Sequence, residues 1–96
     1  MQFRLIDYYD NYQIEDNEFG SVWECNGVAQ TDIVVDLSAE PSNAEIIGTL
    51  REMNLLSLQA TEKTVLVEWY DENWIELTDA QTGEPLYRLV EERSER

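Results

Sequence analysis

Histidine is absent from the 96-residue chain, and cysteine, proline and glycine are rare, with one, two and four copies. Without histidine the chain cannot build a Ser–His–Asp triad, and its glycines are too scattered for a phosphate-binding loop. Cys25 has no partner for an internal disulfide, which fits a reducing, cytoplasmic setting, and we interpret it as a small strand residue. We therefore expect no enzymatic activity and no bound cofactor.

Long apolar runs and basic residues are also scarce. No run approaches the length of a membrane span, and the first residues lack the pattern of a signal peptide. The chain has 6 Lys and Arg against 21 Asp and Glu, which gives a net charge of −15. This charge repels phosphates, so we expect no direct nucleic-acid binding and no membrane association. It favours a basic protein partner, or it serves solubility alone.

Carboxylates are the abundant ionisable groups, and five of them lie close together near the start of the chain. With 21 acids among 96 residues such groupings arise by chance. No EF-hand spacing is present, so we expect no metal site. The run is interpreted either as a solvated loop or as an array that imitates DNA phosphates and occupies a basic groove. Its members are Asp7, Asp10, Glu15, Asp16 and Glu18.

The chain has the length of a single domain, 1–96, and its first third indicates strands. Alternation predicts a strand over Gln2–Tyr8, and the Asp- and Asn-rich stretch Tyr8–Phe19 is predicted as a loop, with one short strand inside it as the alternative. A strand over Ser21–Cys25 precedes Asn26-Gly27, a pair typical of a two-residue hairpin turn. The apolar residues up to Leu37 form either the return strand of that hairpin or a separate strand before a helix.

A helix is indicated from Ser42 onward. Ser42 and Glu45 have the spacing of a capping box, in which each side chain bonds the backbone N–H of the other residue. We expect Asn54 to end the helix in the left-handed conformation. The apolar face predicted to pack on the sheet, with the extended link after it, comprises Ile46, Ile47, Leu50, Met53, Leu55, Leu56 and Leu58.

The stretch Val65–Val90 predicts three antiparallel strands in a meander. Three-residue loops that end at Asn73 and Gly83 would put both residues in the left-handed position. Pro85 indicates that the last strand lies at an edge. The predicted fold class is therefore α+β, with one α-helix packed on a mostly antiparallel β-sheet that ends in a three-stranded C-terminal meander.

The predicted register sorts the meander onto two faces. The inner face, which the helix would cover, holds Val65, Val67, Trp69, Ile75, Leu77, Tyr87 and Leu89. The outer face is half apolar, too much for a face that water simply covers. It holds Leu66, Glu68, Tyr70, Trp74, Glu76, Leu86, Arg88 and Val90. We expect the tyrosine-rich N-terminal segment or a second copy of the chain to cover it. Alternatively it binds another macromolecule through Glu68, Tyr70, Trp74, Glu76, Leu86 and Val90.

Three segments together resemble a known group of sequences. They are IDYYDNYQIEDN near the start, SNAEIIGTLREMNLL in the predicted helix and WIELTDAQTGEPLYRLV in the meander. They are similar to small uncharacterised α+β proteins carried by bacteria, phages and other mobile elements. The resemblance implies an α+β fold and a mobile-element origin, and it implies no activity, because none is established for the group.

Three functional hypotheses follow. The first is a non-enzymatic binding or adaptor module that self-associates into a homo-oligomer through the apolar outer face of its sheet. The second is an inhibitor or DNA mimic, encoded by a mobile element, that binds a basic host protein. The third is a small-molecule binder that uses a pocket between helix and sheet.

Overall fold

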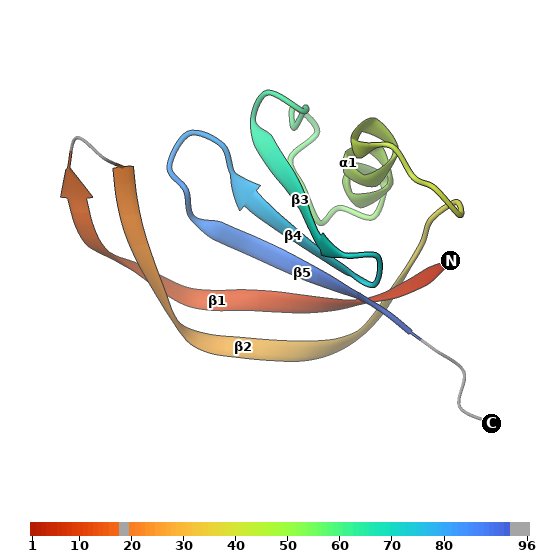
Figure 1. Cartoon of the computed structure of the whole chain (residues 1–96), viewed down its shortest axis with the longest axis horizontal. Helices are drawn as coiled ribbons and strands as arrows, with labels where there is room; N and C mark the ends of the chain where they lie inside the picture. Colours follow the sequence, from red (N-terminus) through yellow and green to blue (C-terminus); the bar gives the residue numbers. More distant parts are fainter. Residues whose placement is uncertain (18–19, 93–96) are drawn as a thin grey trace.

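The computed structural model describes residues 1–17 and 20–92, except for the side chains of residues 9–10, 15–17, 20–22 and 25–26. In this described part of the chain, one helix accompanies five strands in a single sheet (Figure 1). The elements are β1 (Gln2–Asn17), β2 (Gly20–Asp36), α1 (Asn43–Glu52), β3 (Val65–Asp71), β4 (Trp74–Asp79) and β5 (Pro85–Glu91). The strand order is β2-β1-β5-β4-β3, and every described pair is antiparallel. The predicted α+β class, with one helix and a mostly antiparallel sheet, is confirmed.

The first two strands form a long ribbon that the sequence did not predict. β1 and β2 have 16 and 17 residues, and they pair until Asn17 lies opposite Gly20. The predicted loop Tyr8–Phe19 is therefore wrong, since most of it continues β1. The predicted turn at Asn26-Gly27 is also wrong, because Gly27 lies within β2 opposite Tyr9. Asn-Gly permits a tight turn but does not impose one, and pairing along the ribbon outweighs that local preference.

The far part of this ribbon contacts the turn between β4 and β5. The Asn11 amide donates to the Pro85 carbonyl at 2.9 Å and to a Glu84 carboxylate oxygen at 3.1 Å. Further along, the Trp23 indole N–H donates to the Thr82 carbonyl at 2.8 Å. Figure 1 shows the ribbon curving past the other three strands toward this turn. The ribbon is thus tied to the body of the sheet by side chains beyond its ladder with β5.

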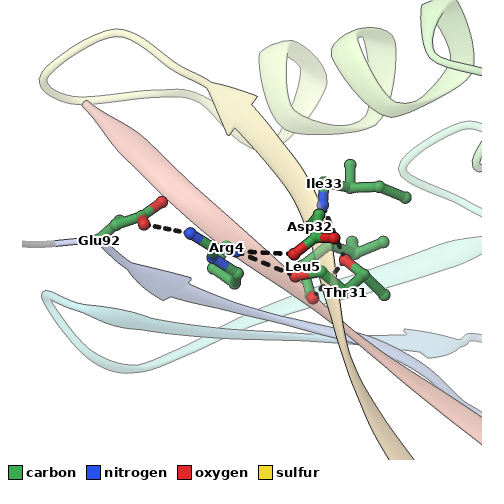
Figure 2. Close-up of polar contacts among 6 residues, drawn as sticks. All are labelled: Arg4, Leu5, Thr31, Asp32, Ile33 and Glu92. Carbon is green, nitrogen blue, oxygen red and sulfur yellow. Dashed lines mark hydrogen bonds and ion pairs between the residues drawn. The ribbon is translucent and has the colours of Figure 1, made fainter.

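A bulge interrupts β2 where it passes Leu5 of β1. The register moves from Arg4 opposite Val34 to Ile6 opposite Gln30, so three residues of β2 face one of β1. Figure 2 shows how polar groups fill this break: the Thr31 hydroxyl donates to the Leu5 carbonyl at 2.8 Å and accepts the Ile33 N–H at 3.1 Å. The Thr31 side chain therefore replaces the missing ladder bonds and keeps the ends of both strands in register.

Helix α1 begins at Ser42 as predicted, but its capping box is half formed. The Ser42 hydroxyl accepts the Glu45 N–H at 3.1 Å. The Glu45 carboxylate turns away and accepts the backbone N–H and the hydroxyl of Ser38, at 2.8 and 2.7 Å. These donors stabilise the charged form and lower the pKa of Glu45. The second arm of the box therefore anchors the helix to the segment before it.

At the end of the helix, the predicted conformation of Asn54 is confirmed, but the predicted burial of two apolar residues is not. Asn54 has a φ of 62°, which is the predicted left-handed position. The helix ends at Glu52, so Met53 leaves the buried stripe and is 37% exposed. Leu55 and Leu56 pack against the core, whereas Leu58 is 80% exposed. Met53 and Leu58 were therefore wrongly predicted as core residues, because the helical face does not continue through the link.

The core lies between α1 and the inner face of the sheet. The predicted inner face is confirmed for its aliphatic residues, and Trp69 is the exception, with 40% of its surface exposed. The first residues of β1 and the last residues of β2 complete the core. The fully or almost fully buried cluster comprises Phe3, Leu5, Val35, Leu37, Ile46, Ile47, Leu50, Ala60, Val65, Val67, Ile75, Leu77 and Leu89.

The meander keeps the predicted register at its centre, but the register shifts near both of its turns. Glu68 lies opposite Glu76, and Glu76 lies opposite Arg88, which puts the three residues on one face as predicted. Asp71, however, pairs with Trp74, and the register shift leaves Tyr70 as an extra residue. The turn has two residues and is held by the Asp71 carboxylate, which accepts the N–H of residue 73 at 3.2 Å. The predicted left-handed Asn73 is therefore wrong, since the bulge absorbs the twist that this conformation would have supplied.

The last strand is central rather than an edge, because β5 lies between β1 and β4. Pro85 nevertheless fits. It is the first residue of β5, and pairing with β1 begins only where Tyr87 lies opposite Asp7. The missing N–H of Pro85 therefore costs no bond to β1, and the edge inference drawn from proline fails for a local reason.

Two glycines should respond to alanine with opposite signs. Gly83 has a φ of 81°, where a side chain is strained, so Gly83→Ala should lower the free energy of unfolding by about 1 kcal/mol. Gly48 lies in α1, and a Cβ there would meet only the Arg51 guanidinium at 3.6 Å, so Gly48→Ala should raise that free energy by about 0.5–1 kcal/mol. Urea unfolding of both variants checks this, and a shift of the same sign in both would contradict it.

Candidate protein-binding face

The outer face of the sheet lies opposite the buried core. Residues directly opposite one another on neighbouring strands share a face, so Trp74 lies with Val90, and Arg88 lies with Ile6 of β1. Among the described residues of the meander, three large hydrophobic side chains of this face stay exposed. Leu66 is 47% exposed, Tyr70 is 60% exposed and Trp74 is 37% exposed. The tyrosine-rich segment does not fold over them, because it continues strand β1, so that prediction is wrong.

A polar hub built on Glu76 organises the centre of the outer face. Its carboxylate accepts the Tyr8 hydroxyl at 2.8 Å, the Trp74 indole N–H at 2.5 Å and the Arg88 Nε–H at 2.5 Å. Three strands supply these groups: Tyr8 comes from β1, Trp74 and Glu76 from β4, and Arg88 from β5. Like other charge-assisted bonds, these hold both partners in fixed positions. The hub therefore presets the orientation of Trp74.

Aromatic and cation–π contacts fix further side chains around the hub. The Arg88 guanidinium carbon lies 4.5 Å from the Trp74 ring centroid and 5.6 Å from that of Tyr8. On its other flank, Trp74 packs against Tyr70 with centroids 5.3 Å apart and planes tilted by 35°. Such aromatic and cation–π contacts stabilise the arrangement by more than the burial of their surface alone. The result is a preorganised row of Tyr8, Arg88, Trp74 and Tyr70, which we call the aromatic row.

The hub changes the acid–base chemistry of Tyr8. Burial, followed by the hydrogen bond and the negative charge of Glu76, raises the pKa of Tyr8 from 10.0 to about 12. The neutral phenol is thus favoured in the folded state. Its contribution to stability is complete below pH 10, and it is lost as the pH rises through 12.

Tyr8→Phe should therefore flatten the decline of stability between pH 10 and pH 12, because the variant has no phenol to titrate. Glu76→Gln should leave part of the decline, since it removes the bond to a charged partner but not the burial. Urea unfolding of the wild-type protein and the two variants, at several pH values in this interval, measures the effect. Equal slopes for wild type and Tyr8→Phe would contradict it.

The structure gathers most of the predicted binding residues and excludes one. Glu68 is exposed on the outer face beside the hub, and Val90 is half-buried opposite Trp74. Leu86 instead packs against the core, because a register shift between β4 and β5 makes it an extra residue. Its assignment to the outer face is wrong, and a bulge of this kind leaves little trace in sequence alternation.

Sequence reasoning also missed the part of this face that β1 supplies. Ile6 lies opposite Arg88, and Tyr8 bonds Glu76, so both extend the surface beyond the meander. Their alternation in the first strand was visible in the sequence. The pairing of β1 with β5 was not, since it joins segments more than 80 residues apart in the chain, as with Phe3 and Glu91.

The acidic run lies on a strand and not in a loop. Asp7 is half-buried on the inner face opposite Tyr87, whose pKa is raised by burial and then by the charge of Asp7. Asp10, Glu15 and Asp16 belong to β1, and Glu18 lies outside the described residues. Asp7 therefore does not contribute to the outer face.

Other kinds of site find less support. A cleft of about 390 Å³ lies under the link after α1 and is lined by Leu55, Ala60, Leu86 and Tyr87, among others. The Tyr87 hydroxyl there already donates to the Leu55 carbonyl at 2.9 Å, so its polar group is engaged. Among the side chains that the structure describes, no acidic residues group as metal ligands would, and the helix in the described part of the chain is too short and polar to cross a membrane.

Comparison with known proteins adds no relative. Neither a scan against protein-family models nor searches of curated proteins and of solved structures find a match to the chain. The resemblance to proteins of mobile elements therefore stays a prediction.

Proposed function

We propose that the chain is a non-enzymatic protein-binding module that docks a basic protein on the outer face of its sheet. The observation that carries this proposal is the exposed patch of Leu66, Tyr70 and Trp74, which no element in the described ranges covers. Exposed aromatic side chains that are already held in place are the usual anchors of protein interfaces. The hub at Glu76 supports this by lowering the ordering cost of docking.

Charge favours a basic partner over a second copy of the chain. The two arginines of the outer face are already matched, Arg88 by Glu76 and Arg4 by Glu92 and Asp32. Glu68 stays exposed on the same face, in a protein with a net charge of −15. A second copy would bring acids against acids and offer no unmatched arginine from this face. A basic partner would complement the same surface.

A DNA mimic is the second candidate, and it would use a different surface. The acids that favour it, Asp10, Glu15 and Asp16, lie along β1 in the ribbon. Such a protein would occupy a basic groove through carboxylates and would not depend on Tyr70. The two candidates therefore differ in which substitutions abolish binding.

The test compares two exposed tyrosines. Tagged wild-type protein, Tyr70→Ala and Tyr12→Ala are used to capture proteins from a cell lysate at low and high salt. Tyr12, 41% exposed on the ribbon, is the matched control. We expect a basic protein that wild type and Tyr12→Ala retain, that Tyr70→Ala loses and that high salt releases. Each retained protein is then purified and its binding measured by calorimetry.

Two outcomes would contradict the proposal. One is a purified partner that binds wild type and Tyr70→Ala equally well. The other is self-association: light scattering that shows a wild-type dimer, converted to a monomer by Tyr70→Ala, would assign the outer face to a second copy of the chain.

A further inference from the structure

A second surface of interest lies on the inner side of the sheet, away from the outer face. Trp69 points to the same side as the core residues, yet it is 40% exposed while its strand partner Ile75 is fully buried. Helix α1 begins only at Asn43, and beside Trp69 lies the segment that precedes it. The Phe3 ring contacts Trp69 edge-on, with centroids 6.3 Å apart and planes at 83°. The exposed indole is therefore held in place from below.

The indole lines a cavity of about 570 Å³ between the β3–β4 turn and the segment that precedes α1. The residues of this Trp69 pocket are Met1, Ala39, Glu40, Pro41, Trp69 and Glu72. Two acidic residues thus line the same pocket as one aromatic residue. Glu40 and Glu72 are exposed, and no hydrogen bond or ion pair engages either carboxylate within the described part of the chain.

The chemistry of this pocket fits a cation. The face of an indole attracts ammonium and guanidinium groups, and flanking carboxylates add charge complementarity. One positive group is already nearby, the Met1 amine, but it donates to the Leu37 carbonyl and is outnumbered by the two acids. The apolar walls from Ala39 and Pro41 suit the methylene stem of a long side chain.

We propose that the Trp69 pocket binds the cationic end of a lysine or arginine side chain. This site is separate from the aromatic row, since Trp69 lies on the inner side of β3 and Trp74 on the outer side of β4. It does not depend on the outer-face proposal, and either one stands if the other fails.

The test uses single amino-acid probes and the three tryptophan indole N–H signals in a 15N-labelled sample. Trp69→Phe assigns its own signal. The probes are Nα-acetyl-arginine amide and Nα-acetyl-lysine amide, with Nα-acetyl-norleucine amide as the neutral match. We expect the cationic probes to shift the Trp69 signal in a saturable way, with Kd on the order of 1–10 mM for so small a ligand. The arginine and lysine arms show which cation is preferred.

Charge-matched variants distinguish binding in the pocket from the nonspecific attraction of a cation to an acidic protein. Glu40→Gln with Glu72→Gln should weaken binding at least about fivefold, because both flanking carboxylates are lost. Glu52→Gln with Glu62→Gln removes the same charge at exposed positions elsewhere and should leave Kd within about twofold. The proposal is overturned if the Trp69 signal does not move, if the neutral probe moves it equally, or if the two double variants weaken binding alike.

Discussion

Leu50→Ala is expected to lower the free energy of unfolding by about 2–5 kcal/mol, whereas Leu58→Ala should change it by less than about 0.5 kcal/mol. The two substitutions remove the same atoms. Leu50 belongs to α1 and is fully buried in the core, so its loss leaves a cavity there. Leu58 is 80% exposed, so its loss uncovers little that was not already in water.

Urea unfolding at neutral pH measures both effects. Equal slopes of the unfolding free energy against urea concentration would show that both variants expose similar surface areas on unfolding. The result matters beyond the core. The sequence pattern treated both leucines as buried, and the fold separates them. Similar losses for the two variants would mean that the link after α1 packs differently from the structure described above.

Trp74→Ala is expected to weaken binding of the captured basic partner by at least about 30-fold, a loss of about 2 kcal/mol or more. Trp74 is the most constrained anchor of the outer face, because its indole bonds Glu76 and its ring lies between Arg88 and Tyr70. Calorimetric titration of the purified partner measures this loss. Tyr70→Ala should weaken binding too, without disturbing the hub.

Trp23→Ala is the matched control for this experiment. Trp23 lies on the ribbon and donates to the Thr82 carbonyl, so its loss loosens a contact that involves no member of the aromatic row. We expect it to leave the partner's Kd within about twofold. Equal losses for the two tryptophan variants would point to a general effect on folding, and an unchanged Kd for Trp74→Ala would remove the outer face from the interface.

The sequence predicted those features that local chemistry decides. The helix start at Ser42, its stop at Asn54 and the turn at Gly83 each rest on one residue with a strong conformational preference. The register at the centre of the meander was also correct, with Glu76 opposite Arg88, because a one-residue shift there would turn its apolar side chains to the wrong face, whereas the shifts near both turns were missed. These features needed no knowledge of the rest of the chain.

Features that depend on distant pairing were missed. Asn26-Gly27 has the composition of a turn, but β2 continues through it because the whole length of β1 lies alongside. The partner strand of β5 could not be inferred, so Pro85 was assigned to an edge and β1 was left out of the outer face. Such pairings are decided by the packing of the complete sheet, not by the residues of one segment.

The residues of the candidate site also fall into those that the sequence placed correctly and those that it did not. Tyr70, Trp74 and Glu68 were placed on the outer face by alternation, and the structure keeps them there. Tyr8 was assigned to a covering segment, and in the structure it becomes part of the surface. The Trp69 pocket was invisible in sequence, since its lining combines the first residue, the segment before α1 and the β3–β4 hairpin, which are distant in the chain.

Site-specific photocrosslinking tests the central claim most directly. Benzoylphenylalanine replaces Tyr70 on the outer face or Leu58 on the exposed link, and the protein is irradiated in cell lysate. Both positions are open, at 60% and 80% exposure, so accessibility does not decide the result. Docking on the outer face predicts a crosslink from position 70 to a basic protein, and none to that protein from position 58. A crosslink from position 70 only to a second copy of the chain, or the same products from both positions, would contradict it.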